Sequence, residues 1–318
     1  MLATIITQMQ IILNQFLVRA RGWGWRLAGS ALLGLLAGCA GPRTVPPPVT
    51  PPVPVIAKPA PKLGLALGGG AARGFAHVGV LQVLEEAGLK PDLVAGTSAG
   101  SLVAALHTSG RNGAQLQALA MEMDEAAFAD WTLPVFNRGM LRGEALARYV
   151  NQQVGHKLIE QLPVPLGILA TDLATGQGVL FRRGDVGTAV RASSAVPAVF
   201  LPVRIGSQEF VDGGLVAPVP VRQVRQMGAE FVIAVDISSA PEGNASGDAI
   251  AMLLQTFAIM GRSINQWELR EADLVVRPAL AGMRGADFSA RGRAIAAGRA
   301  AMQAALPQLR AALAAKAL

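Results

Sequence analysis

The stretch that decides the fold runs from Leu63 to Gly100, with LGLALGGGAARG at residues 63–74 and LVAGTSAG at residues 93–100. Each segment is a short apolar run that ends in small residues. Between them, residues 73–87 have the apolar spacing of a helix, which Gly88 would close. Strand, glycine-rich turn and helix alternate as in a βαβ unit. The stretch therefore predicts an α/β fold with a mainly parallel central sheet.

The rest of the chain continues this alternation. We expect the last helix to pack its apolar face against the core, and Pro307 should bend or divide that helix. The other helices are expected at 99–108, 115–123, 142–154 and 250–267, and the later strands at 166–171, 178–181, 203–205, 210–211, 231–235 and 274–277.

Composition limits the classes of protein to which the chain can belong. Of its 318 residues, 52% are hydrophobic and 15% charged, which excludes a mostly disordered chain. Only 5% are aromatic and no dense Lys/Arg run is present, so no nucleic-acid partner is expected. The single cysteine, Cys39, excludes an internal disulfide and a cysteine-based zinc site.

The amino-terminal region resembles the export signal of a bacterial lipoprotein. Arg19, Arg21 and Arg26 precede an apolar run at residues 27–36, which is too short to cross a bilayer and is typical of a signal peptide. The run ends in Leu36-Ala37-Gly38-Cys39, which resembles a lipobox. The resemblance implies that the Cys39 thiol is acylated and that Cys39 becomes the first residue of the mature chain. The alternative is a cysteine discarded with the whole signal peptide.

The lipobox divides the chain into a signal peptide at 1–38, a tether at 39–62 and a globular domain at 63–318. The tether has nine prolines among residues 40–62, so we expect a semi-rigid polyproline spacer. Ala40, directly after the cysteine, implies sorting to the outer membrane. The chain is thus expected to be an exported lipoprotein that faces the periplasm and is held at the membrane by acyl chains.

The segment Gly96-Thr97-Ser98-Ala99-Gly100 lies where the second strand turns into its helix. Small residues on both sides of a serine permit the sharp turn of a nucleophile elbow, which lifts the hydroxyl above the sheet. The alternative is a glycine-rich turn with an N-capping serine. The pattern makes Ser98 the candidate nucleophile, with Gly96 and Gly100 as the elbow glycines.

A serine nucleophile needs a base, and histidine does not provide one here. No histidine follows residue 156, so the Ser, acid, His order of the α/β-hydrolases is excluded. His107 lies too far along the helix of Ser98, and His77 is expected to pack locally. Asp212 is the candidate, because Gly213 and Gly214 follow it, and its site should be desolvated enough to raise its pKa. On sequence alone its rivals are Asp92, Asp172, Asp185 and Asp236.

The glycine-rich loop at 68–74 joins the first strand to its helix. Its N–H groups would converge at a helix N-terminus, which favours an anion. A dinucleotide site would need an acidic residue about 20 positions further on, but Ala95–Ser98 occupy that place. The loop is therefore predicted to stabilise the oxyanion of an acyl-transfer intermediate.

Loop, elbow and Asp-Gly-Gly motif, in this order, resemble the patatin-like phospholipase family, and so does ASSAVPAVF at residues 192–200. The resemblance implies a three-layer α/β/α fold and hydrolysis of lipid esters by a Ser–Asp dyad, with no metal or cofactor. One departure is Ala71, where many members have glycine. The site residues carried over are Ser98 and Asp212 for catalysis, Gly69, Gly70, Ala71, Arg73 and Gly74 for the oxyanion hole, Gly96 and Gly100 for the elbow, and Gly213 and Gly214 for the Asp motif.

The expected function is a serine acyl hydrolase that cleaves phospholipids or lysophospholipids through an acyl-enzyme. Two alternatives stay open: a membrane-anchored binding protein with the same fold but no activity, and an esterase or thioesterase for small substrates. Residues 128–140, which include Trp131 and Phe136, would form either an apolar cover over the site or part of the core, and core packing is favoured.

Overall fold

The computed structural model of the chain describes residues 60–123, 130, 138–238, 249–285 and 287–316. The signal peptide, Cys39 and nearly all of the tether lie outside the described residues, as does most of the segment 128–140. The expectations for those segments remain predictions.

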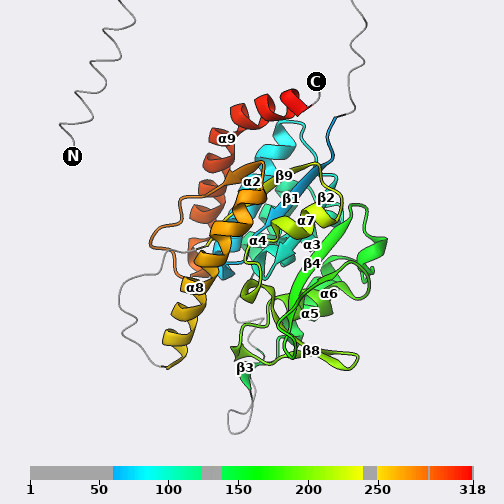
Figure 1. The fold of residues 1–318 in the computed structure, drawn as a ribbon, viewed down its shortest axis with the longest axis vertical. Coiled ribbons are helices and arrows are strands. Elements are labelled where there is room, and N and C mark those ends of the chain that lie inside the picture. The colour runs from blue at the N-terminus through cyan, green and yellow to red at the C-terminus, as the bar shows by residue number, and fades with distance from the viewer. Residues whose placement is uncertain (1–59, 124–129, 131–137, 239–248, 286, 317–318) are drawn as a thin grey trace, which may run out of the picture. The chain divides into compact units, whose positions relative to one another are not determined.

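The central sheet is mixed and mainly parallel, as predicted, and its parallel strands are neighbours of one another (Figure 1). Its order is β10-β9-β1-β2-β4-β8-β7, with β5 paired to β4. The first five strands of this order are parallel to one another, and β5, β8 and β7 are added in antiparallel fashion. The bounds are β1 Leu63–Leu67, β2 Leu93–Thr97, β4 Leu166–Asp172, β5 Gly178–Phe181, β7 Val203–Ile205, β8 Gln208–Asp212, β9 Phe231–Val235 and β10 Leu274–Val276.

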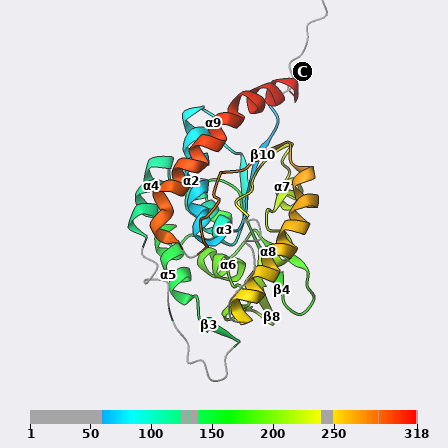
Figure 2. The same ribbon diagram turned by 90° about the vertical axis from the view of Figure 1, so that its left-hand side faces the viewer.

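Helices cover both faces of the sheet, which confirms the three-layer α/β/α architecture (Figure 2). Leu65 and Leu67 of β1 point into the larger core, while Ala66 between them points into the smaller one. On the larger side pack α2 Ala76–Glu86, α3 Ala99–Thr108, α4 Gly113–Glu122, α5 Glu144–Gln153, α6 Val186–Ser193 and α9 Arg291–Lys316, and on the smaller side lie α7 Val221–Gln226 and α8 Ala249–Glu268.

Several elements differ from the sequence expectation, which did not include α6 and α7. The helix expected from Arg73 begins instead as a 3-10 turn, η1 (Ala71–Phe75), and becomes α-helical at Ala76. A second, two-stranded parallel sheet pairs β3 (Gly139–Leu141) with β6 (Ala198–Phe200). The sequence expectations did not include these two strands, which pair across about 60 residues of chain.

Helix α9 packs along α2 and buries Ile295, Met302 and Leu309, as predicted for a core-facing helix. It continues through Pro307, and its last turns run in a different direction from the rest (Figures 1 and 2). No helix in the described part of the chain has the length and apolar character needed to span a bilayer.

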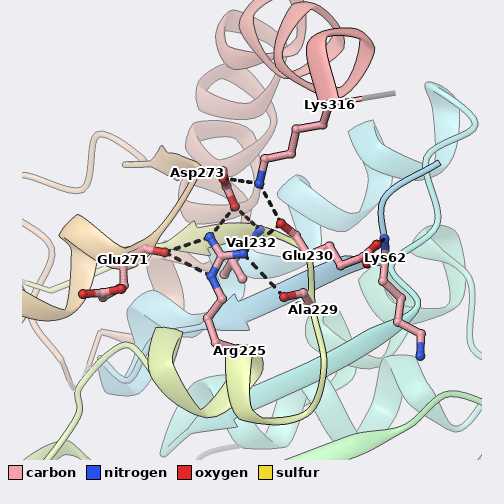
Figure 3. Close-up of polar contacts among 8 residues, drawn as sticks. All are labelled: Lys62, Arg225, Ala229, Glu230, Val232, Glu271, Asp273 and Lys316. Atoms are coloured by element: carbon pink, nitrogen blue, oxygen red, sulfur yellow. Dashed lines mark hydrogen bonds and ion pairs between the residues drawn. The ribbon is translucent and has the colours of Figure 1, made fainter. Parts of the chain in front are cut away.

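A polar cluster fastens the end of α9 to the amino-terminal edge of the parallel strands (Figure 3). Lys316 Nζ donates to Asp273 Oδ1 at 2.8 Å and to the Glu230 carbonyl at 2.7 Å. Arg225 of α7 reaches the other oxygen of Asp273 at 2.5 Å, and the Lys62 N–H donates to Glu230. This edge is opposite to the one where the glycine loop and Ser98 lie, so the cluster stabilises the fold away from the candidate site.

Candidate active site

The candidate site lies at the carboxyl ends of the parallel strands, where open α/β sheets bind their ligands. β1 ends at the glycine loop and β2 ends at Ser98. Asp212 is the last residue of β8 and pairs with Ala170 of β4, the neighbour of β2. Gly213, directly after it, lies against Thr97, because an added Cβ would come within 3.2 Å of the Thr97 methyl group. The structure therefore brings the three predicted motifs to one place.

The backbone at Ser98 has φ 52° and ψ −125°, a combination that is rare for a residue with a side chain. Ser98 is half-buried. The turn needs glycine on both sides for steric reasons. A Cβ at Gly96 would lie 2.4 Å from the Gly100 carbonyl oxygen, and one at Gly100 would lie 2.1 Å from that of Leu67. These contacts explain why the elbow glycines stand where they do.

Ser193, at the end of α6, holds the elbow and has no counterpart in the residue roles predicted from sequence. Its hydroxyl accepts the Ser98 N–H at 2.8 Å and donates to the Leu169 carbonyl at 2.6 Å. Two residues further on, the Ala195 carbonyl accepts the Asp212 N–H at 3.0 Å. One short segment thus positions the backbones of both Ser98 and Asp212. The stretch ASSAVPAVF was the available sequence signal, but nothing in it specified this role.

Asp212 is a buried carboxyl with one free oxygen. Its Oδ1 accepts the Gly214 N–H at 2.6 Å, whereas Oδ2 has no hydrogen-bond partner among the described residues. Burial raises the pKa of Asp212 from 3.8 to about 6, against the opposing effects of the Ser98 hydroxyl and the Gly214 N–H. The Ser98 side chain is thus close enough to favour the charged form, although its contact with Asp212 is not a formed hydrogen bond. This carboxyl is desolvated, as the sequence argument required.

The rival carboxylates are engaged elsewhere. Asp92 accepts the Leu63 N–H at 2.6 Å, and Asp185 caps α6 through the Thr188 N–H at 2.6 Å. Asp172 accepts two N–H groups of the turn that follows it. Asp236 binds Ser238 and Arg277. Of the five aspartates considered, Asp212 is the one that interacts with Ser98.

The glycine loop presents N–H groups next to Ser98. A Cβ at Gly69 would lie 3.1 Å from the Ser98 Cβ, so the loop backbone passes directly beside the serine. The Gly69 N–H donates to the Pro218 carbonyl at 2.9 Å, and the Arg73 N–H donates to the Gly70 carbonyl at 3.2 Å. Within the described residues, the N–H groups of Gly70 and Ala71 have no acceptor. The predicted loop therefore offers two free donors.

Two further features of this region bear on the loop. Ala71 has φ 50°, in the left-handed region, which explains why a glycine is readily accommodated at this position in similar loops. Ala99 begins α3, and its N–H also has no acceptor within the described part of the chain. The residue after a nucleophile is a frequent oxyanion donor. Ala99 is thus a candidate third donor, which the sequence argument did not include.

His77 supports the loop from below and is fully buried. Its Nε2 lies 2.8 Å from the carbonyl oxygen of Gly68, which is the first residue of the glycine loop. Burial lowers the pKa of His77 from 6.5 to about 4, so the ring is neutral near pH 7 and must donate its proton from Nε2. His77 therefore has a local packing role, in agreement with the sequence argument.

The His77 environment predicts a pH dependence of stability. Between pH about 4 and about 6.5 the unfolded chain binds a proton at this ring that the folded chain does not, so stability falls as the pH is lowered. His77→Gln keeps an amide N–H donor but does not titrate. Relative to this variant, the wild type should lose up to about 3 kcal/mol of unfolding free energy on going from pH 7 to pH 4. Urea denaturation at each pH measures the difference in unfolding free energy between the two proteins. A difference that does not change with pH would contradict the claim that the His77 ring is buried and neutral.

Comparison with known proteins places these features in context. The family model described as "Patatin-like phospholipase" matches residues 65–225, about half of the chain. The uncharacterized NTE family protein Rv1063c of Mycobacterium tuberculosis is 36% identical over 198 residues, covering 58% of this chain and 51% of that protein. Patatin-like phospholipase domain-containing protein 6 of Mus musculus is 34% identical over 230 residues, covering 69% of this chain and 16% of that protein.

The chain thus spans about half the length of the mycobacterial relative and a small part of the mouse protein. Among solved structures, VipD from Legionella pneumophila aligns with 79% of this chain and 68% of its own, at 14% identity and a TM-score of 0.46.

Proposed function

Because the chain belongs to the patatin-like phospholipase family, we propose that it is a serine acyl hydrolase that cleaves ester bonds of phospholipids or lysophospholipids through a Ser98–Asp212 dyad. The observation that carries the proposal is the desolvated Asp212 carboxyl, with one unpaired oxygen, beside a serine held in a strained elbow. A serine that served only as a helix cap would not need this backbone conformation, and its side chain accepts no N–H of α3.

The reaction follows from the positions of these groups. Asp212 takes the Ser98 proton as the hydroxyl oxygen attacks the ester carbonyl, and the N–H groups of Gly70 and Ala71 stabilise the negative charge on the carbonyl oxygen. Collapse of the tetrahedral intermediate breaks the bond to the ester oxygen, which takes the proton from Asp212 and leaves as the alcohol. Water then attacks the acyl-enzyme, with Asp212 again as base, and releases the fatty acid and the free serine.

The raised pKa of Asp212 suits a general base that works near neutral pH. It also predicts a pH profile. Only the ionised carboxylate can accept the serine proton, so kcat/KM on a neutral, soluble ester should rise with pH through about 6 and reach a plateau above it. An initial-rate series from pH 4.5 to 8 measures the profile. A rate that is already nearly constant from pH 4.5 upward, as an ordinary aspartate value of 3.8 would give, would contradict a desolvated base.

The substrate class is tested with the full chain on three substrates. These are phosphatidylcholine vesicles, lysophosphatidylcholine and a short-chain nitrophenyl ester, and the readout is free fatty acid or nitrophenol released. Hydrolysis of the lipids supports the proposal. Turnover of the short ester alone would favour the small-substrate esterase, and turnover of none of the three would favour a non-catalytic binding protein.

We also propose that the protein is exported and held at the outer membrane, facing the periplasm, by acyl chains on Cys39. The support is the lipobox Leu36–Cys39 and the proline-rich tether that follows it. In a bacterial host that processes lipoproteins, the chain should incorporate radiolabelled palmitate and fractionate with the outer membrane, and Cys39→Ser should abolish both. Equal labelling of the variant would argue against this site of attachment.

A further inference from the structure

Helix α8 has two halves with different surroundings. Its carboxyl-terminal half is fastened to the molecule, because the buried Glu268 pairs with Arg222 and Asn265 contacts Asp236. Gly261 lies against Pro218, where an added Cβ would come within 3.3 Å of the proline ring. The helix also packs beside η4 (Gly213–Leu215), the turn that directly follows Asp212. The helix is therefore anchored next to the candidate site.

The amino-terminal half, AIAMLLQTFAIM at residues 249–260, is uncharged and is apolar except for Gln255 and Thr256. None of these residues is buried, and Met252, Ile259 and Met260 are 61%, 53% and 50% exposed. A helix on the surface of a globular protein usually turns charged and polar residues outward. Several large apolar side chains exposed on one helix segment indicate a contact with a partner or a membrane.

The charge around α8 favours an anionic lipid surface. Arg262 follows the apolar half, is exposed, and has no ionic partner among the described residues. Trp267 is 65% exposed, and the Arg270 guanidinium lies 4.3 Å from its ring centroid. Glu268, the one acidic residue of the helix, is buried and paired. Apolar residues flanked by arginine and an exposed tryptophan are typical of helices that lie in the membrane interface.

The place of α8 in the fold fits this reading. The helix lies on the smaller side of the sheet, and its amino-terminal half, yellow in the ribbon, extends toward the end of the molecule where β3 and β8 lie (Figures 1 and 2). The helix packs beside the turn after Asp212. Insertion of the apolar half into a lipid surface would therefore bring that surface close to the Ser98 site.

We propose that residues 249–260 of α8 form a membrane-docking surface, assisted by Arg262, that binds anionic phospholipid bilayers and presents them to the candidate active site. This inference extends the proposed function, since a lipid hydrolase must engage an aggregated substrate. It does not depend on turnover, however, because docking requires only the exposed side chains of α8.

The test measures vesicle binding without catalysis. The full chain is prepared with Ser98→Ala and Cys39→Ser, so that neither turnover nor an acyl chain contributes. It is mixed with vesicles of phosphatidylcholine containing phosphatidylglycerol, and binding is measured by flotation. Adding Met252→Gln and Ile259→Gln should weaken binding roughly tenfold. Met121→Gln on α4 is the matched control, because Met121 is 53% exposed, and it should change nothing.

Two kinetic readouts accompany the binding measurement. With Ser98 and Cys39 intact, Met252→Gln/Ile259→Gln should leave kcat/KM on a soluble ester unchanged and reduce hydrolysis of vesicle lipid. Unchanged vesicle binding by this double variant, or an equal loss with Met121→Gln, would overturn the proposal.

Other occupants of this face give different outcomes, and each would overturn the proposal. A double variant that dissociates an oligomer in lipid-free buffer would identify a second copy of the chain. A marked loss of thermal stability would mean that another segment of the same chain covers the face.

Intact α8-dependent docking by a protein with no hydrolytic activity would refute the proposed function and leave the docking proposal standing.

Discussion

Replacing Ser98 with alanine should reduce ester hydrolysis by a factor on the order of 10⁴ to 10⁶ and leave the chain folded. The expectation follows from covalent catalysis, because without the hydroxyl no acyl-enzyme can form and only the oxyanion donors and substrate binding remain. Alanine keeps the Cβ and therefore the backbone strain, so the unfolding free energy should change little. Initial rates on a short-chain ester and urea denaturation measure the two quantities.

Two further variants sharpen this result. Ser109→Ala, at the other end of α3, removes a hydroxyl that donates to the Leu106 carbonyl, and it should leave the rate unchanged. Ser98→Gly should be as inactive as alanine but more stable by about 1–2 kcal/mol, because glycine adopts φ 52° without strain. Residual activity of Ser98→Ala within tenfold of the wild type would exclude Ser98 as the nucleophile.

Asp212→Asn should lower kcat by about 10²–10⁴-fold and at the same time stabilise the protein. Burial raises the pKa of Asp212 from 3.8 to about 6, so between these values the folded carboxyl keeps a proton that the unfolded one releases. Stability therefore falls as pH rises through this window, and above pH about 6 the folded state bears the full cost of the buried charge, about 3 kcal/mol. Asparagine removes that charge and still accepts the Gly214 N–H.

The stabilisation should disappear at low pH, which supplies the control. At pH 4 the wild-type carboxyl is largely protonated in the folded state, so Asp212→Asn and the wild type should have similar unfolding free energies there. Asp92→Asn is a matched variant at an exposed aspartate and should not gain stability at pH 8. An Asp212→Asn protein that is less stable than the wild type at pH 8 would contradict the claim that the Asp212 carboxyl is desolvated.

Much of the central sheet follows from local sequence. The strands at 178–181, 203–205 and 231–235 have the predicted bounds, because each is a short segment of mostly apolar residues bounded by turn residues. β8 is longer than predicted, and β10 ends one residue earlier. The elbow was predictable because Gly96-Thr97-Ser98-Ala99-Gly100 is a local pattern that stands between an apolar run and a helix. The resemblance to the patatin-like family then added the three-layer arrangement, which the structure confirms.

The remaining features depend on pairings between distant residues. The contact of the Ser193 hydroxyl with the Ser98 N–H joins segments 95 residues apart, so no local pattern reveals it. Which loop N–H groups are free depends on the carbonyls of Pro218 and Gly285, which accept from Gly69 and Ala72. The exposed apolar face of α8 is likewise indistinguishable, from sequence alone, from an ordinary buried helix face.

The central claim is that Ser98 is an activated nucleophile, and covalent labelling tests it most directly. The folded full chain is treated with a fluorophosphonate probe, which reacts with activated serines, and the modified residue is identified by peptide mapping. The account predicts stoichiometric labelling of Ser98 in the wild type, much slower labelling in Asp212→Asn and none in Ser98→Ala. A folded wild-type chain that remains unlabelled, or that is labelled elsewhere with Ser98 unmodified, would contradict it.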